Sequence, residues 1–216
     1  MTVMDVSKDP HDVPEGDLPD DPAALLALIA AERERTRRRT APSFALIGSA
    51  WGVAWLAGYL TLFLTADGPV PADWAFGVFS ALLVVAVVIT AVHTTRRAAG
   101  IRGDSATVGA MYGITWFVAF LAAGLLFAGA VRAGAGDAVM AVLTNGVSCI
   151  IVGLLYMAGG ALWREWPMFG LGAWVALVAG AAALLGTPAA YLVMALAGGG
   201  GFLVAVLVDL ARRRSA

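Results

Sequence analysis

Residues 74–95 read WAFGVFSALLVVAVVITAVHTT, a run of 22 residues without a carboxylate, lysine or arginine. At the 1.5 Å rise of an α-helix this run is about 33 Å long, enough to cross the ~30 Å hydrocarbon core of a bilayer. Other runs of similar length and composition place further spans, and together they predict an all-α, polytopic membrane bundle of six transmembrane helices. The remaining spans are drawn over residues 44–65, 107–131, 138–162, 167–186 and 188–210.

The basic residues are divided unequally between the two sides of these spans. One side carries thirteen of the 14 lysines and arginines, and the other carries Arg132 alone. Because basic residues are enriched in cytoplasmic loops, both termini are predicted to be cytoplasmic. The larger group is Lys8, Arg33, Arg35, Arg37, Arg38, Arg39, Arg96, Arg97, Arg102, Arg164, Arg212, Arg213 and Arg214.

The N-terminal 40 residues precede the first span and divide into two segments. Residues 1–21 predict a disordered acidic tail, since they hold seven acidic side chains, one lysine and three prolines. Asp21-Pro22 then predicts the start of a cytoplasmic amphipathic helix over residues 22–40. Residues 41–211 form the predicted six-helix domain, and 212–216 a basic tail. The juxtamembrane arginines suit an anionic membrane surface or serve only to set topology, and both roles stay open: Arg33, Arg35, Arg37, Arg38 and Arg39.

The first and third spans share the pattern Gly-x-x-aromatic-Gly-x-x-Trp. It runs from Gly48 to Trp55 and again from Gly109 to Trp116, 61 residues later, and a decayed version surrounds Trp174 a further 58 residues on. The spacing predicts three helical hairpin repeats of the same orientation, related by an axis along the membrane normal.

Glycines recur along the spans at helical spacing. Lipid tails are as apolar as leucine, so membrane helices associate by close packing, which small residues permit. We therefore interpret these glycines as helix-packing positions rather than ligand contacts: Gly48, Gly52, Gly109, Gly113, Gly146, Gly153, Gly160, Gly172, Gly180, Gly198 and Gly201.

Five uncharged side chains within the spans are candidates for a cavity. Trp55 and Trp116 lie nine to eleven residues inside their spans, too deep for an interfacial aromatic belt. Asn145 carries an amide that needs hydrogen-bond partners in a lipid environment. Each tryptophan either packs in the core or walls a cavity, and Asn145 either clamps two helices or lines that cavity. Thr115 and Ser148 complete the candidate set.

Groups that usually carry chemistry are scarce in the predicted spans. No charge lies at the middle of a span, Cys149 is the sole cysteine, and the two histidines are far apart in sequence. We expect no catalytic site, no metal site, no cofactor and no nucleic-acid partner, and we do not expect an enzyme. His93, at the cytoplasmic end of its span, either titrates near neutrality or is simply interfacial.

Several stretches resemble uncharacterised bacterial six-span membrane proteins, which are often labelled transporter or hypothetical. They are Asp21–Arg39, Ala110–Gly113, Gly159–Trp163 and Leu196–Phe202. A looser likeness, on Gly172–Gly180, Pro188 and Arg212–Arg214, is to acid-resistance membrane proteins of the HdeD type, whose six spans form paired repeats. The resemblance implies a multi-pass protein of the bacterial cytoplasmic (inner) membrane.

Two functional hypotheses follow. The first is a transport-related protein, either a small carrier or pore or the membrane accessory subunit of an export system. A carrier predicts a water-accessible cavity lined by Trp55, Trp116 and Asn145. The alternative is a structural or regulatory membrane module that acts through partners, either further copies of itself or another membrane protein. A membrane enzyme is a third, less favoured possibility.

Overall fold

The structure, a computed structural model, describes residues 21–40, 43–68, 70–99 and 104–214. Six helical spans are long and apolar enough to cross a membrane, which confirms the predicted six-span helical bundle. Their ends fall within a few residues of the predicted ones, because hydrophobic runs bounded by charged or turn residues define them. They are α2 (Phe44–Leu64), α3 (Asp73–Ala98), α4 (Asp104–Arg132), α5 (Asp137–Trp163), α6 (Trp166–Leu185), and a sixth span built from α7 (Ala189–Val193), η1 (Met194–Gly199) and α8 (Gly200–Arg214).

The helix α1 (Pro22–Thr40) belongs to a separate unit of the chain. It starts where Asp21-Pro22 predicted, and the Asp21 carboxylate caps it by accepting a hydrogen bond from the Ala23 amide at 3.0 Å. Residues 1–20, where the acidic tail was predicted, lie outside the described residues, as do the side chains of Arg33, Arg35, Arg37, Arg38 and Arg39. The amphipathic role of α1 at a membrane surface stays a prediction.

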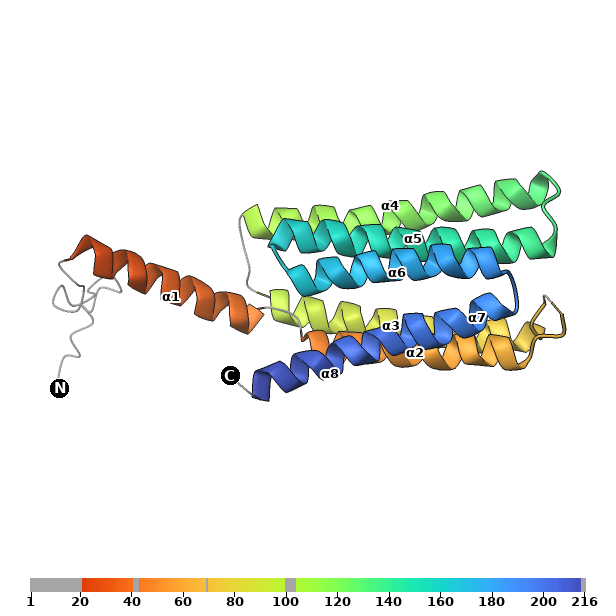
Figure 1. The fold of residues 1–216 in the computed structure, drawn as a ribbon. Helices are drawn as coiled ribbons and strands as arrows, with labels where there is room; N and C mark the ends of the chain where they lie inside the picture. Colours follow the sequence, from red (N-terminus) through yellow and green to blue (C-terminus); the bar gives the residue numbers. More distant parts are fainter. Residues whose placement is uncertain (1–20, 41–42, 69, 100–103, 215–216) are drawn as a thin grey trace, which may run out of the picture. The chain divides into compact units, whose positions relative to one another are not determined.

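The six spans pack as two sets of three (Figure 1). In one set α5 lies between α4 and α6. In the other, α2 contacts both α3 and the whole sixth span, from α7 through η1 to α8. Contacts between α6 and the sixth span join the two sets. The outermost helices, α3 and α4, are therefore attached along one side only.

A turn of two residues, Arg164 and Glu165, connects α5 to α6. Arg164 adopts the left-handed backbone conformation, with φ 56°. In this conformation the Glu165 amide donates to the carbonyl of Gly160 at 2.7 Å, which satisfies an acceptor at the end of α5. The turn brings α6 directly back along α5.

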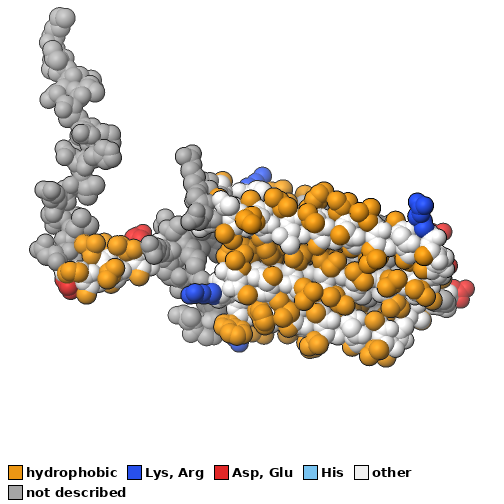
Figure 2. Space-filling view, turned by 90° about the horizontal axis from the view of Figure 1, so that it is seen from above, with side chains coloured by type: hydrophobic (Ala, Val, Ile, Leu, Met, Phe, Trp, Pro, Cys, Tyr) orange, Lys and Arg blue, Asp and Glu red, His pale blue; other side chains and the backbone are white. Residues whose placement is uncertain are grey.

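The interior of the six-helix unit is apolar, with small and aliphatic side chains packed around a few aromatic rings. Phe202, Leu62, Met194 and Val175 are its largest fully buried side chains. The lateral surface is apolar too: Figure 2 shows hydrophobic side chains along the side of the unit, with charged side chains at its two ends. About 6% of the apolar window of α4 is buried, against 39% for α2. The exposed remainder is suited to lipid or to another membrane helix.

Close contacts occur at seven of the eleven predicted packing glycines. There a Cβ atom would lie 3.0 Å or less from a neighbouring atom, and at Gly153 and Gly172 the neighbour is the backbone of the facing helix. Gly58, Gly159 and Gly199 are equally tight, although the sequence reading did not single them out. The seven are Gly48, Gly52, Gly153, Gly160, Gly172, Gly198 and Gly201.

The other four predicted glycines have no such neighbour in the described chain. A Cβ at Gly109, Gly113, Gly146 or Gly180 would meet no atom within 4 Å. In α4 the reason is that bulky residues make the contact with α5: Tyr112 donates to the Leu155 carbonyl. Within the described chain these four positions are therefore not sites of close helix packing.

The three tryptophans of the predicted repeat have different environments. Trp55 is 3% exposed and lies between α2 and α8, beside Phe202. Trp116 is half-buried against Tyr156, and Trp174 is largely exposed while its indole donates to the Ala197 carbonyl at 2.9 Å. The strongest helix pair, α5 with α6, also crosses two predicted hairpins. The threefold repeat stays a prediction.

Substituting alanine at Gly172 and at Gly180 should separate the effect of close packing on stability from the effect of helix propensity, because both glycines lie in α6. The Gly172 Cβ would lie 2.5 Å from the Gly153 carbonyl oxygen, so Gly172→Ala should lower the free energy of unfolding by about 1–3 kcal/mol. Gly180→Ala meets open space and should be neutral or stabilising by up to about 1 kcal/mol. Unfolding by SDS in mixed micelles, followed by circular dichroism, measures both, and equal stability of the two variants would contradict the packing.

Candidate functional site

A small polar cluster lies between α2 and α5, inside the membrane-spanning part of the bundle. The Tyr59 hydroxyl donates a hydrogen bond to Asn145 Oδ1 at 2.5 Å. The same hydroxyl lies 3.5 Å from the Sγ of Cys149, one helical turn beyond Asn145. Tyr59 and Cys149 are buried, whereas Asn145 is half-buried. The cluster connects the two sets of three helices.

Aromatic rings surround this cluster and extend it through the bundle. Tyr59 packs edge-on against Trp55, with 5.8 Å between the ring centroids. Its ring is tilted against that of Phe79 of α3, with 4.6 Å between the centroids. From Trp55 the contacts continue to Phe202 of α8 at 5.5 Å, and from Phe202 to Tyr156 of α5 at 6.0 Å. These separations are typical of favourable aromatic pairs. The rings fill the space between α2, α5 and α8.

The five candidate cavity residues do not converge on one site. Trp55 and Asn145 both contact Tyr59, whereas Trp116 meets Tyr156 on the side of α4. Ser148 is half-buried on α5. Thr115 is exposed, and its hydroxyl donates to the Met111 carbonyl of its own helix at 2.9 Å.

The described surface has shallow hollows, and they lie away from the predicted cavity. One of about 310 Å³ is at the ends of α2 and α3, beside His93 and Arg96. Another, of about 260 Å³, lies between α4 and Leu162 and includes Thr115. Neither is lined by Trp55, Trp116, Asn145 or Ser148. The cavity around the two tryptophans stays a prediction: the rings of Tyr59 and Phe202 pack against Trp55, and that of Tyr156 packs against Trp116.

The Tyr59 cluster is suited to act as a clamp, that is, to hold α2 and α5 together by a hydrogen bond. In the described part of the chain, every buried side-chain nitrogen or oxygen has a hydrogen-bond partner. A hydrogen bond between membrane helices contributes about 0.6–1.7 kcal/mol, which suits a contact that fixes how α5 sits against α2. The sequence predicted a clamp at Asn145 but did not identify its partner. Tyr59 lies four residues after Trp55, on the same face of its helix, and this spacing is the signal that could have pointed to it.

Aromatic side chains donate further hydrogen bonds between helices. The Trp51 indole donates to Thr90 Oγ1 at 3.0 Å, joining α2 to α3, and the Tyr112 hydroxyl donates to the Leu155 carbonyl at 2.8 Å, joining α4 to α5. The Trp174 indole joins α6 to η1. Aromatic side chains therefore supply both apolar contacts and hydrogen bonds between the helices.

Comparison with protein-family models, with curated proteins and with solved structures finds no match. The likeness to uncharacterised six-span and HdeD-type proteins accordingly stays an expectation from the sequence. The residues of the chain itself are the basis for the function proposed below.

A double-mutant cycle on Tyr59 and Asn145 should reveal their coupling. Tyr59→Phe removes the donor, and Asn145→Ala removes the acceptor. The double variant should lose less unfolding free energy than the sum of the two single losses, by about 0.6–1.7 kcal/mol. Thr115→Val, which removes a hydroxyl bonded to its own helix, serves as the control and should stay within about 0.5 kcal/mol of the wild type. Additive effects of Tyr59→Phe and Asn145→Ala would show that the clamp contributes nothing.

Proposed function

We propose that this chain is a non-enzymatic integral membrane subunit that acts through protein contacts along its lipid-facing helices. In this role it is the membrane accessory subunit of a larger export system, with the basic end of the bundle in the cytoplasm. The observation that carries the proposal is the one-sided attachment of α4.

The exposed side of α4 has features that favour another helix over lipid alone. Gly109 and Gly113 are exposed and have no neighbour within 4 Å of a built Cβ in the described chain. Glycine lowers helix propensity by about 1 kcal/mol relative to alanine, and it offers lipid no packing advantage. Pairs of glycines spaced by four residues instead permit the close approach of a second membrane helix.

The filled interior supports a role through contacts rather than through a solute path. Trp55 and Tyr59 are 3% and 4% exposed. Phe202, which packs between Trp55 and Tyr156, is 1% exposed. A carrier needs a water-accessible site near the middle of the membrane. Around Trp55 the rings of Tyr59 and Phe202 are closely packed, which favours a contact role.

A small carrier or pore is the second candidate, and η1 is the observation that favours it. Met194–Gly199 is π-helical, and π-helical turns are frequent at functional sites. Glycines in this segment contact α2 directly, so a change in the turn would move the wall beside Trp55.

Leucine at Gly113 should disrupt partner binding without disturbing the fold. The larger side chain enters open space in the described chain but blocks close approach of a second helix. We expect the fraction of protein in a larger assembly, extracted from native membranes in mild detergent, to fall at least about threefold. Gly129→Leu, on the same helix but about 160° around it from Gly113, is the matched control, because its side chain also enters open space.

The outcome also separates the two candidates. An accessory subunit migrates in a complex with a reproducible protein partner, and proteoliposomes that contain this chain alone pass no small solute. A chain that runs at its own mass, or an equal loss with Gly129→Leu, contradicts the proposal. Solute flux that Asn145→Leu abolishes would establish the carrier instead.

A further inference from the structure

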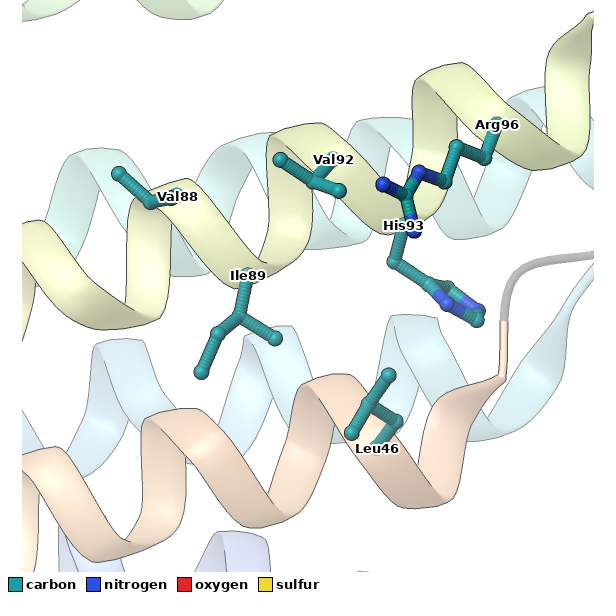
Figure 3. Close-up of a pocket in the computed structure, with 6 residues that line it drawn as sticks. All are labelled: Leu46, Val88, Ile89, Val92, His93 and Arg96. Atoms are coloured by element: carbon teal, nitrogen blue, oxygen red, sulfur yellow. The ribbon is translucent and has the colours of Figure 1, made fainter.

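The hollow beside His93 combines an apolar wall with a cationic end. It lies between α2 and α3 near the C-terminal end of α3 and has a volume of about 310 Å³. Figure 3 shows the branched side chains of α3 along the hollow, with the side chain of Arg96 directed back towards His93. Its lining is Leu46, Val88, Ile89, Val92, His93 and Arg96.

The apolar wall is open to the surroundings of the bundle. Val88 and Val92 are 53% and 43% exposed, and Leu46, across the hollow on α2, is 45% exposed. From Val88 to Arg96 the helix rises about 12 Å, so the hollow runs from a charged residue in the last turn of α3 into the apolar part of the span. Its direction is that of a lipid chain lying against a membrane protein, and it can hold the part of the chain next to the headgroup.

His93 is held in place at the charged end of the hollow. Its Nε2 accepts a hydrogen bond from the backbone amide of Ser43, the N-cap residue of α2, at 3.0 Å. Because Nε2 is an acceptor, a neutral ring carries its hydrogen on Nδ1. Nδ1 is thus a donor with a fixed orientation.

Arg96 supplies the positive charge. Within the described residues its guanidinium forms no ion pair and no hydrogen bond with another side chain. A guanidinium is always charged and donates several hydrogen bonds in a geometry that matches phosphate. Its charge complements a phosphodiester at the level of the lipid headgroups.

We propose that this hollow binds an anionic phospholipid. Arg96 and the Nδ1 of His93 contact the phosphate, and one acyl chain packs along Val88, Val92 and Leu46. Basic pockets between membrane helices are a recurrent form of headgroup recognition. This inference depends on the membrane location of the bundle and is independent of the proposed accessory function.

Native mass spectrometry of the full chain in mild detergent tests the proposal. The probes are phosphatidylglycerol and phosphatidylcholine with identical acyl chains, each titrated against the protein. We expect phosphatidylglycerol to bind more tightly, and Arg96→Gln to weaken its binding about fivefold, the effect of about 1 kcal/mol per basic residue. Arg212→Gln removes the same charge from the last turn of α8, outside the hollow, and should leave binding unchanged.

A second pair of variants tests the acyl-chain wall. Val92→Trp fills the hollow and should also weaken phosphatidylglycerol binding. Val87 is 51% exposed on another face of α3, so Val87→Trp should leave the binding unchanged. Thermal unfolding of each variant verifies that the bundle is intact.

Four results would overturn the lipid site. The first three are equal affinity for the two lipids, equal losses in Arg96→Gln and Arg212→Gln, and equal effects of Val92→Trp and Val87→Trp. Displacement of phosphatidylglycerol by millimolar inorganic phosphate would assign the charged end to free phosphate and likewise overturn it.

Discussion

Where α5 passes α6, the carbonyl oxygen of Gly153 lies so near Gly172 that a single added carbon would be 2.5 Å away. Inside a bilayer no hydrophobic force drives two apolar helices together, so contact of this kind must supply the attraction. The two-residue turn at Arg164 and Glu165 sets the helices antiparallel at the required distance. The rest of the bundle is arranged around this pair, because α4 contacts α5 and the sixth span contacts α6.

Hydrogen bonds between helices then determine which faces meet. Tyr59, Trp51, Tyr112 and Trp174 each place one polar atom at the edge of a large apolar ring. Such a side chain fills space in the same way as phenylalanine, and its own N–H or O–H donor finds an acceptor that lipid would not supply. The interior therefore combines dense packing with specific orientation, and it needs no charged group.

The number and extent of the spans were predictable, because the length of an apolar run reports on the thickness of the hydrocarbon core and its hydropathy on the cost of placing its side chains there. The pairing of the spans was not. Gly109 and Gly48 occupy matching positions in the sequence pattern, yet Gly48 faces Val206 of α8 and Gly109 faces open space. Contact depends on what the opposite helix presents, and a single sequence does not contain that information. Tyr59 was overlooked for the same reason, since its importance arises from Asn145, 86 residues away.

The π-helical turn at Met194–Gly199 has a consequence for the length of the chain. A π-turn closes hydrogen bonds from residue i to i+5 and so accommodates one residue more than an α-helical turn. Removing one residue from this segment would restore the α-helix and leave the residues that follow on the same face of the span. Phe202 and Val206, both buried against α2, would keep their places in the interface. In a regular α-helical segment the same deletion would turn everything after it by about 100°, so the π-turn is where this span can lose a residue without changing its buried face.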